Sequence, residues 1–297
     1  MVILLLTRQA TDVQKFSFFV IIAAIALGSF ACNLLTVEED PSEYPTVFPR
    51  YNMEELRAMN TEYSALNNGR LCSTLNEYGF TGFSEIFFEN DENPCDRANR
   101  QVVEIEMTNP DTLESAAKRV LLQNSKYTGV EDTAALVLSK ITPQPGCINC
   151  GRPDEYSANI EWSLTFEEQV VDSVTVPGTE IIVFVDALGV NRIWGNWYPQ
   201  FKVPEFVNFG YLDVQEGMVG WQIDMRNYTG EEQIYTVQEE DITEQPHKVY
   251  LPLENEKGLE IRTCWAVPIL NSSNENFEGW IAYIDIEEGY LVEMVAK

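Results

Sequence analysis

Residues 279–292 read Gly-Trp-Ile-Ala-Tyr-Ile-Asp-Ile-Glu-Glu-Gly-Tyr-Leu-Val, and this stretch decides the fold class. Its first half is rich in aromatic and β-branched residues, which is typical of a β-strand. Asp285 and Gly289 are turn-forming residues, and a second apolar run follows them. The stretch therefore predicts an antiparallel β-hairpin.

A similar stretch lies earlier in the chain, at residues 180–193, which read Glu-Ile-Ile-Val-Phe-Val-Asp-Ala-Leu-Gly-Val-Asn-Arg-Ile. Asp186 lies 99 residues before Asp285. Trp162, in another predicted strand, lies 103 residues before Trp265. A nearly constant offset of this kind indicates two copies of one structural unit.

Each predicted copy also has a helical stretch before its strands. Residues 112–124 place their apolar side chains on one face of a helix, and residues 211–219 do so over a shorter length. A further amphipathic helix is predicted at 53–66. The sequence therefore predicts an α+β fold of two related units, each an antiparallel β-sheet covered by a helix.

Composition and turn residues divide the chain into four parts. Proline-containing residues 198–204 read as a linker between the two units. The predicted parts are a signal peptide (1–31), an acidic, proline-containing tether (32–50), an N-terminal α+β domain (51–204) and a C-terminal domain (205–297).

The N-terminal residues have the features of an export signal. Basic residues precede the apolar stretch 16–31, and Cys32 follows it directly. The stretch is short for a membrane-spanning helix, and acidic residues follow it. This arrangement resembles a bacterial lipoprotein signal, in which the cysteine is lipidated. The alternative is ordinary cleavage after Ser29-Phe-Ala31. We expect an exported cell-envelope protein, lipid-anchored at the outer face of a bacterial membrane.

The charge balance limits the partners of the protein. The chain has 47 Asp and Glu residues against 19 Lys and Arg residues, which gives a formal net charge of -28. Nucleic acid and anionic lipid headgroups are repelled by such a charge, so membrane contact is expected through the lipid anchor only. Because the acids are spread along the chain, we interpret them as a solvated surface. Binding of cations or of a cationic partner is the alternative.

Five cysteines follow the predicted lipidation site. Disulfides persist outside the cytoplasm, and Cys72 and Cys95 flank a polar, loop-rich stretch, so we predict that they pair. Cys147 and Cys150 lie among Pro and Gly residues. This context predicts a loop braced by a local disulfide rather than a redox pair at the start of a helix. Cys264 is predicted to be a buried free thiol.

One spaced pattern carries a family resemblance. Its residues are Trp265, Gly279, Trp280, Tyr283, Asp285 and Gly289. In this spacing they resemble the PepSY domain of thermolysin-like protease propeptides and of exported bacterial proteins. Residues 174–189 similarly resemble the propeptide segment that precedes PepSY. Together the two resemblances span residues 112–297, and so include the second half of the N-terminal domain.

The resemblance implies a module that binds or inhibits a protease and assists its folding. The first copy departs from the pattern, because its Asp186-to-Gly189 turn is one residue shorter than the turn in the second copy. The same residues also have a structural interpretation, in which Trp and Tyr pack under the helix while Asp and Gly form the turn.

No catalytic motif is present. The sequence has no His-Glu-x-x-His, no Gly-x-Ser-x-Gly and a single histidine, His247. No short motif singles out a pair of carboxylates for a hydrolase, although the chain has many acids. We therefore expect no enzyme, no metal site and no cofactor.

The leading hypothesis is a non-catalytic envelope lipoprotein whose PepSY-like modules bind a protein partner, with an exported protease as one candidate. The alternative is a structural or assembly subunit of a cell-surface complex. In that alternative the aromatic residues Trp194, Trp197 and Tyr198 form an interface, because a protein without a partner keeps such a cluster covered.

Overall fold

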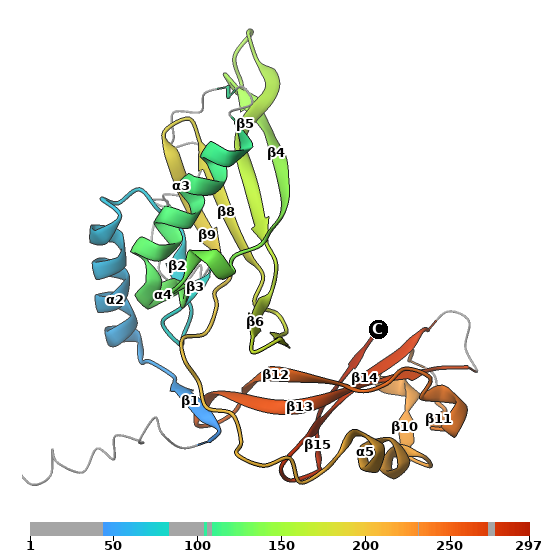
Figure 1. Cartoon of the computed structure of the whole chain (residues 1–297). Helices are drawn as coiled ribbons and strands as arrows, with labels where there is room; N and C mark the ends of the chain where they lie inside the picture. The colour runs from blue at the N-terminus through green and yellow to red at the C-terminus, as the bar shows by residue number, and fades with distance from the viewer. Residues whose placement is uncertain (1–43, 83–103, 106–108, 231, 273–276) are drawn as a thin grey trace, which may run out of the picture. The chain divides into compact units, whose positions relative to one another are not determined.

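The computed structural model of the chain (Figure 1) describes residues 44–82, 104–105, 109–230, 232–272 and 277–297. The predicted signal peptide and Cys32 lie outside these residues. Antiparallel sheets dominate the described residues and helices are few, which confirms the α+β class. No helix in this described part of the chain is long and apolar enough to cross a membrane.

The first sheet has four antiparallel strands in the order β4-β5-β8-β9. These strands are β4 (Leu138–Ile148), β5 (Tyr156–Phe166), β8 (Ile181–Asp186) and β9 (Gly189–Trp194). Helix α3 (Pro110–Gln123) lies across one face of this sheet (Figure 1). It buries Leu113, Ala117 and Leu121 against alternate strand residues such as Leu164, which is fully buried. Alternate residues of the strands and residues three or four apart in the helix therefore pack together in one core.

The second sheet has seven strands, in the order β15-β14-β13-β12-β7-β6, with β1 paired to β13. Its strands are β1 (Thr46–Pro49), β6 (Gln169–Val171), β7 (Val174–Val176), β12 (His247–Glu254), β13 (Gly258–Leu270), β14 (Gly279–Asp285) and β15 (Leu291–Ala296). Helix α5 (Tyr211–Met218) packs on β13 and buries Val214 and Met218.

The remaining elements are the 14-residue helix α2 and several short strands and helical turns. They are α2 (Met53–Leu66), β2 (Thr74–Leu75), β3 (Thr81–Gly82), α4 (Ser125–Thr128), η4 (Thr133–Ala135), β10 (Gln222–Asp224), η5 (Met225–Asn227), β11 (Ile234–Thr236) and η6 (Glu239–Asp241). Strands β2 and β3 form one small antiparallel sheet, and β10 and β11 form another.

The predicted repeat is visible in the pairing register. In the first sheet, Trp162 lies opposite the residue just before Asp186. In the second sheet, Trp265 lies opposite the residue just before Asp285. The two tryptophans therefore occupy the same place relative to their hairpin turns. Their offsets differ because the β6–β7 hairpin lies between the paired strands of the first sheet only.

The structure bears on two of the predicted boundaries, those at residues 50 and 204. The tether at 32–50 was extended too far, because residues 46–49 form strand β1 and pair with β13. Pro41, Pro45 and the acidic residues of this segment indicate a linker, but an edge strand accepts proline. The boundary at 204 lies between β9 and α5. Strands β6 and β7 precede it and yet join the sheet that forms after it, and residues 44–297 are one compact unit.

Strand β4 corrects the predicted loop around Cys147. Pro143 and Pro145 lie inside this strand, and Cys147 is near its end. Proline cannot donate to a β-ladder, so it is tolerated on an edge strand or at a bulge. Both conditions hold here, because β4 is an edge strand and its register shifts between Gln144 and Pro145. Only Cys150 lies in the turn that follows.

The C-terminal ends of α2 and α3 are joined by two asparagines. Asn67, the C-cap of α2, donates from Nδ2 to Oδ1 of Asn124 at 2.7 Å. Asn124, the C-cap of α3, donates back to Oδ1 of Asn67 at 3.0 Å. Each amide also donates to a carbonyl of its own helix. Both side chains are buried, so this reciprocal pair fixes α2 against the first unit.

We expect Asn67→Ala and Asn124→Ala each to lower the free energy of unfolding by about 1–3 kcal/mol, because each leaves a buried amide without its partner. The double variant should lose about 1 kcal/mol less than the sum of the two single variants, since they share one interaction. Urea unfolding of the full chain, followed by tryptophan fluorescence, measures this cycle. Additive losses would contradict the reciprocal bond.

Candidate functional site

The turn of the C-terminal hairpin is built around Asp285, whose side chain is fully buried. Its Oδ1 accepts hydrogen bonds from the backbone N–H groups of Glu287 and Glu288, both at 2.8 Å. The N–H of Gly289 donates to the Asp285 carbonyl at 2.9 Å, and φ at Gly289 is +74°. A left-handed backbone favours glycine, so Asp285 and Gly289 together form this turn.

The other oxygen of Asp285 binds an arginine of the same sheet. Nη1 of Arg262 donates to Oδ2 of Asp285 at 2.9 Å, and Nε of Arg262 donates to Glu260 at 2.8 Å. Burial alone would lower the pKa of Arg262, but the hydrogen bonds to these two carboxylates outweigh burial and raise it. The ring of Tyr290 lies over the guanidinium, 5.7 Å from ring centroid to Cζ. The arginine is therefore a permanent charge inside the turn.

Asp186 has the same place in the first hairpin. Its Oδ1 accepts from the backbone N–H of Leu188 at 2.8 Å and from Arg70, while its Oδ2 accepts from Asn191 at 3.0 Å. Here the arginine comes from the loop after α2 and not from the sheet. The side chain of Asp186 is 23% exposed, whereas that of Asp285 is 0% exposed. If the turn aspartate is removed, water can therefore solvate part of the groups left unpaired in the first hairpin, but not those left unpaired in the second.

The segment before α5 is held by the C-terminal hairpin. The N–H groups of Asn208 and Phe209 donate to the carbonyl of Ile286 at 3.0 and 3.1 Å. The Phe209 ring lies against Gly289, where a Cβ would come within 2.6 Å of it. Nε1 of Trp265 donates to the Phe209 carbonyl at 2.8 Å. The turn glycine thus has a second role, because it admits this aromatic ring.

This docking leaves a group of large apolar side chains exposed, which we call the apolar strip. The apolar strip consists of Phe206, Val207, Phe209, Leu212 and Tyr290. Phe206 is 71% exposed and Leu212 is 57% exposed. The first four follow one another along the segment, and Tyr290 follows the glycine that Phe209 touches. The strip therefore combines residues of the segment before α5, residues of α5 and a residue of the hairpin, and the backbone at Asn208 and Phe209 is hydrogen-bonded to that hairpin.

A groove of about 420 Å³ continues the apolar strip beside α5. Its walls are Leu212, Gln215, Glu216, Val219, Glu239 and Ile242. Leu212 belongs to both the strip and the groove, and Val219 is another exposed apolar residue. Helical spacing places Leu212, Glu216 and Val219 on the same side of α5. The site combines an exposed apolar floor with acidic walls.

The aromatic residues of the PepSY-like pattern lie on both faces of the second sheet. Trp280 is fully buried in the core under α5, where it contacts the rings of Tyr228, Tyr235 and Phe277. Tyr283 is an odd number of residues away, so it points to the opposite face. The prediction that both pack under the helix is therefore wrong for Tyr283. Trp265 is half-buried and holds the segment before α5.

The predicted aromatic interface does not form one surface. Trp197 is only 6% exposed and lies in the core of the first unit. Tyr198 stacks on Phe48, with ring centroids 5.6 Å apart, and its burial raises its pKa to about 12. Trp194 alone is exposed, where it packs edge-on against Phe184. These three residues are close in sequence, but strand β9 ends at Trp194, so Trp197 and Tyr198 lie in different surroundings.

The cysteines form disulfides on the first unit. Cys147 and Cys150 are joined to each other. Cys72 is disulfide-bonded, and Cys95, its predicted partner, lies outside the described residues, so that pairing stays a prediction. Cys264 is a free, buried thiol whose pKa is raised to about 12 by burial, and it is therefore unreactive at neutral pH. The disulfides are consistent with an oxidising environment outside the cytoplasm.

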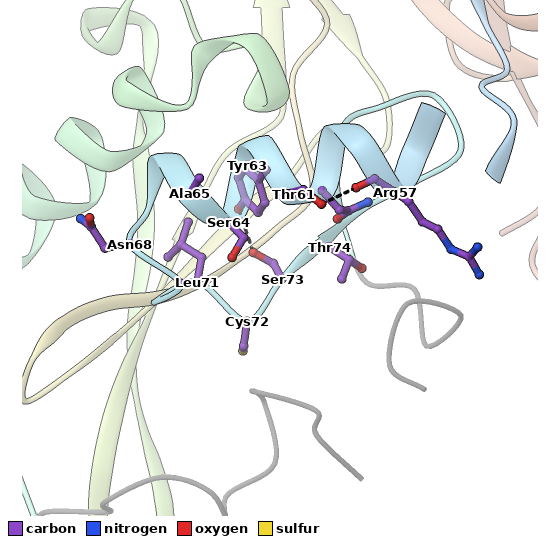
Figure 2. Close-up of a pocket in the computed structure, with 12 residues that line it drawn as sticks. Arg57, Thr61, Tyr63, Ser64, Ala65, Asn68, Leu71, Cys72, Ser73 and Thr74 are labelled. Carbon is purple, nitrogen blue, oxygen red and sulfur yellow. Dashed lines mark hydrogen bonds between the residues drawn. The ribbon is translucent and has the colours of Figure 1, made fainter. Parts of the chain in front are cut away.

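Cys72 lies at a hollow of about 700 Å³ beside α2 (Figure 2). The residues that line this hollow include Asn60, Ser64 and Ser73, together with Tyr63, whose hydroxyl hydrogen-bonds Ser73 at 2.9 Å. None of the lining residues in the described part of the chain is a carboxylate or an imidazole. The described hydroxyl and amide groups can form hydrogen bonds with polar atoms.

The carboxylates near the two hairpin turns form hydrogen bonds and ion pairs within the fold. Glu161 accepts from Arg192 at 2.6 Å and lies beside Asp186 across the strands. Asn191 donates to both carboxylates, at 3.2 and 3.0 Å. Arginines and an amide therefore occupy the oxygens that a hydrolytic pair would use. In the described part of the chain, no three His, Cys, Asp or Glu side chains cluster as metal ligands would.

Sequence reasoning missed the apolar strip. The sequence predicts a linker at residues 198–204 and a short helix at 211–219, with no exposed contact surface between them. A signal was available, because Phe206-Val-Asn-Phe209 is an apolar run with neither strand nor helix period, and it stands between a proline and a glycine. Large apolar residues in such a loop have no core face and tend to mark a contact surface. The arginine partners of the two aspartates carry no local signal.

We expect Asp285→Ala to lower the free energy of unfolding by about 3–5 kcal/mol, because it removes the partner of a buried arginine. The matched change Asp186→Ala should cost about 1–2 kcal/mol, because water can reach the groups left behind. Urea unfolding of both variants at neutral pH makes the comparison. Equal losses would show that the two turns are not distinguished by burial.

Comparisons with known proteins add little to this geometry. No protein-family model matches the chain, and no curated protein matches it. Among solved structures, the chain is similar to the C-terminal domain of YpeB from Bacillus megaterium. The similarity has a TM-score of 0.28 at 8% sequence identity, and it covers 66% of this chain and 68% of that chain. Similarity at this level carries no argument, so the site is assigned from its own residues.

Proposed function

We propose that this chain is a non-catalytic cell-envelope protein, lipid-anchored at Cys32 on the outer face of a bacterial membrane, that binds a protein partner through the apolar strip. The PepSY-like pattern implies an exported protease as the first partner to test. The protein holds or inhibits that partner and contributes no reacting group of its own.

The apolar strip is the observation that carries this proposal. Soluble proteins rarely expose several large apolar side chains side by side without a partner. Here Phe206, Leu212 and Tyr290 are exposed, and the segment between Phe206 and Leu212 is hydrogen-bonded to the hairpin through the N–H groups of Asn208 and Phe209. A preorganised apolar surface loses little conformational entropy on binding, which favours protein recognition. The groove beside α5 gives this surface a concave end.

The alternative function, a subunit of a surface assembly, has less support. It was based on an aromatic interface at Trp194, Trp197 and Tyr198. Trp197 is buried in the core and Tyr198 packs against Phe48, so neither offers a surface to another subunit. Trp194 by itself is one exposed side chain and needs no partner to explain it.

The lipid anchor is tested by the mass of the protein in its native membrane. We expect an intact mass that begins at Cys32 and includes acyl chains, and we expect Cys32→Ser to remove the acyl mass and to release the protein from membranes. A wild-type mass without acyl groups would contradict the anchor and favour the alternative cleavage after Ala31.

The binding surface is tested by changing the strip without changing the core. We expect the double variant Phe206→Ser/Leu212→Ser to retain about tenfold less co-purifying partner than the wild type. Apolar anchors of an interface each contribute about 1–2 kcal/mol or more, so the loss of two reduces the affinity by at least this factor. The measurement is quantitative mass spectrometry of proteins that elute with the tagged chain after detergent release. An exported protease is then assayed with and without equimolar chain.

Leu188→Ser is the matched control. Leu188 is 78% exposed at the tip of the first hairpin, so this change also removes an exposed leucine. The control should keep the partner, and circular dichroism should be the same for all variants. If the strip variant keeps its partner as well as the control does, the apolar strip is not the binding surface and the proposal fails.

A further inference from the structure

The surroundings of the groove are acidic over a long stretch of sequence. Between Val203 and Pro246 the chain has ten Asp and Glu residues and one basic residue, Arg226. Arg226 is bonded to Asp224 at 2.5 Å, so its charge is already compensated. The nearest other cations are Lys202, at the start of the strip, and Lys248, whose Nζ lies over the ring of Trp265.

Several of these acids are exposed and make no ion pair within the described residues. They are Glu205, Asp213, Glu216, Glu232, Glu239, Glu240 and Glu244. Glu216, on α5, and Glu239, in η6, both line the groove beside α5. Two carboxylates without an ion pair in the described residues therefore line the groove together with the apolar residues Leu212, Val219 and Ile242. In such a concave site the low-dielectric walls strengthen the negative potential.

This charge pattern discriminates between the occupants that an apolar groove could take. An anionic membrane surface is repelled, although the exposed Phe206 and Leu212 would otherwise insert into lipid. A second copy of this chain is also repelled, because it carries the same negative charge at the same surface. A cationic partner is attracted, and its apolar side chains can fill the groove.

Resting on the proposed function, we infer that the groove beside α5 and the apolar strip bind a cationic amphipathic segment of the protein partner. Its apolar side chains lie on Leu212 and Val219, and its Lys or Arg side chains reach Glu216 and Glu239. A groove of about 420 Å³ has the size of a typical pocket for a few large side chains. In helix-in-groove recognition the bound helix places its apolar residues, at i, i+3, i+4 and i+7, into such a groove.

The test uses the full chain in detergent and two synthetic probes. One probe is a helical peptide with leucine on one face and lysine on the other, and the second has glutamate at each lysine position. Fluorescence anisotropy measures binding of each labelled peptide. Protein variants are compared in the same detergent, so binding of peptide to micelles is common to all of them.

We expect the lysine peptide to bind and the glutamate peptide not to bind. Glu216→Gln/Glu239→Gln should weaken binding of the lysine peptide by roughly two- to fivefold per charge, with the effect reduced by salt. Leu212→Ser/Val219→Ser should weaken it about tenfold. The control Glu131→Gln/Glu167→Gln removes the same number of exposed charges elsewhere and should change nothing.

Three results overturn the inference. Equal binding of the two peptides shows that charge does not select the occupant. Equal weakening by the control pair shows that net charge acts and not the groove. Self-association of the chain that is lost in Leu212→Ser/Val219→Ser shows that a second copy is the occupant.

The native partner separates this inference from the proposed function. A partner that is lost in Phe206→Ser/Leu212→Ser but unaffected by Glu216→Gln/Glu239→Gln leaves the proposed function standing and overturns the inference. A lysine peptide that binds in the groove, while no native partner depends on the strip, supports the inference about the groove and overturns the proposed function.

Discussion

A single buried carboxylate organises the C-terminal half of this protein. Asp285 has no exposure to water, so its charge must be satisfied inside the fold. Two backbone amides of the turn and Arg262 do this, and the same bonds close the β14–β15 hairpin. The closed hairpin then offers the carbonyl of Ile286 and the bare backbone of Gly289 to the segment before α5. The position of the apolar strip follows from those contacts. The exposed apolar strip is thus a consequence of how one charge is buried.

In the first hairpin the charge of the turn aspartate is compensated by different neighbours. Asp186 also accepts from a backbone amide of its turn, that of Leu188, and from an arginine, but this arginine, Arg70, comes from the loop after α2. The cation that balances the turn aspartate is therefore not part of the repeated unit. Only the aspartate and the glycine need to recur, because only they form the turn itself. This explains why two structurally equivalent hairpins share such a short sequence pattern. It also explains why the two tryptophans keep their register while their surroundings differ.

Local periodicity predicted most of the secondary structure, because it reports which face of each element is buried. Helix 53–66 and the hairpin strands 181–186 and 279–285 follow directly from it. The part of strand β4 after Ile141 was missed because its prolines and glycine have the composition of a loop, and only its edge position makes them acceptable. Strand β1 was missed for a related reason, because four residues are too few to show a period.

The candidate site was harder to predict than the fold. The turn residues Asp285 and Gly289 stand out in the sequence, but their partners do not. Arg262 is one of many charged residues, and nothing local marks it as the partner of Asp285. The exposure of Phe206 depends on how the segment docks, which is a tertiary property. Tyr283 was assigned to the wrong face, although counting residues from Trp280 in steps of two was enough to place it.

The acidic surface and the apolar strip are best understood together. Exposed phenylalanine and leucine side chains make a protein prone to self-association and to nonspecific membrane contact. A net charge of -28 opposes both, because copies of the chain repel one another and anionic lipid repels the chain. The charge therefore opposes the self-association that the exposed apolar strip would otherwise favour. Among the described residues, neither Glu216 nor Glu239 at the groove forms an ion pair. Under the proposed function, a partner with both apolar side chains and positive charge would cover the apolar strip and compensate these acids at the same time.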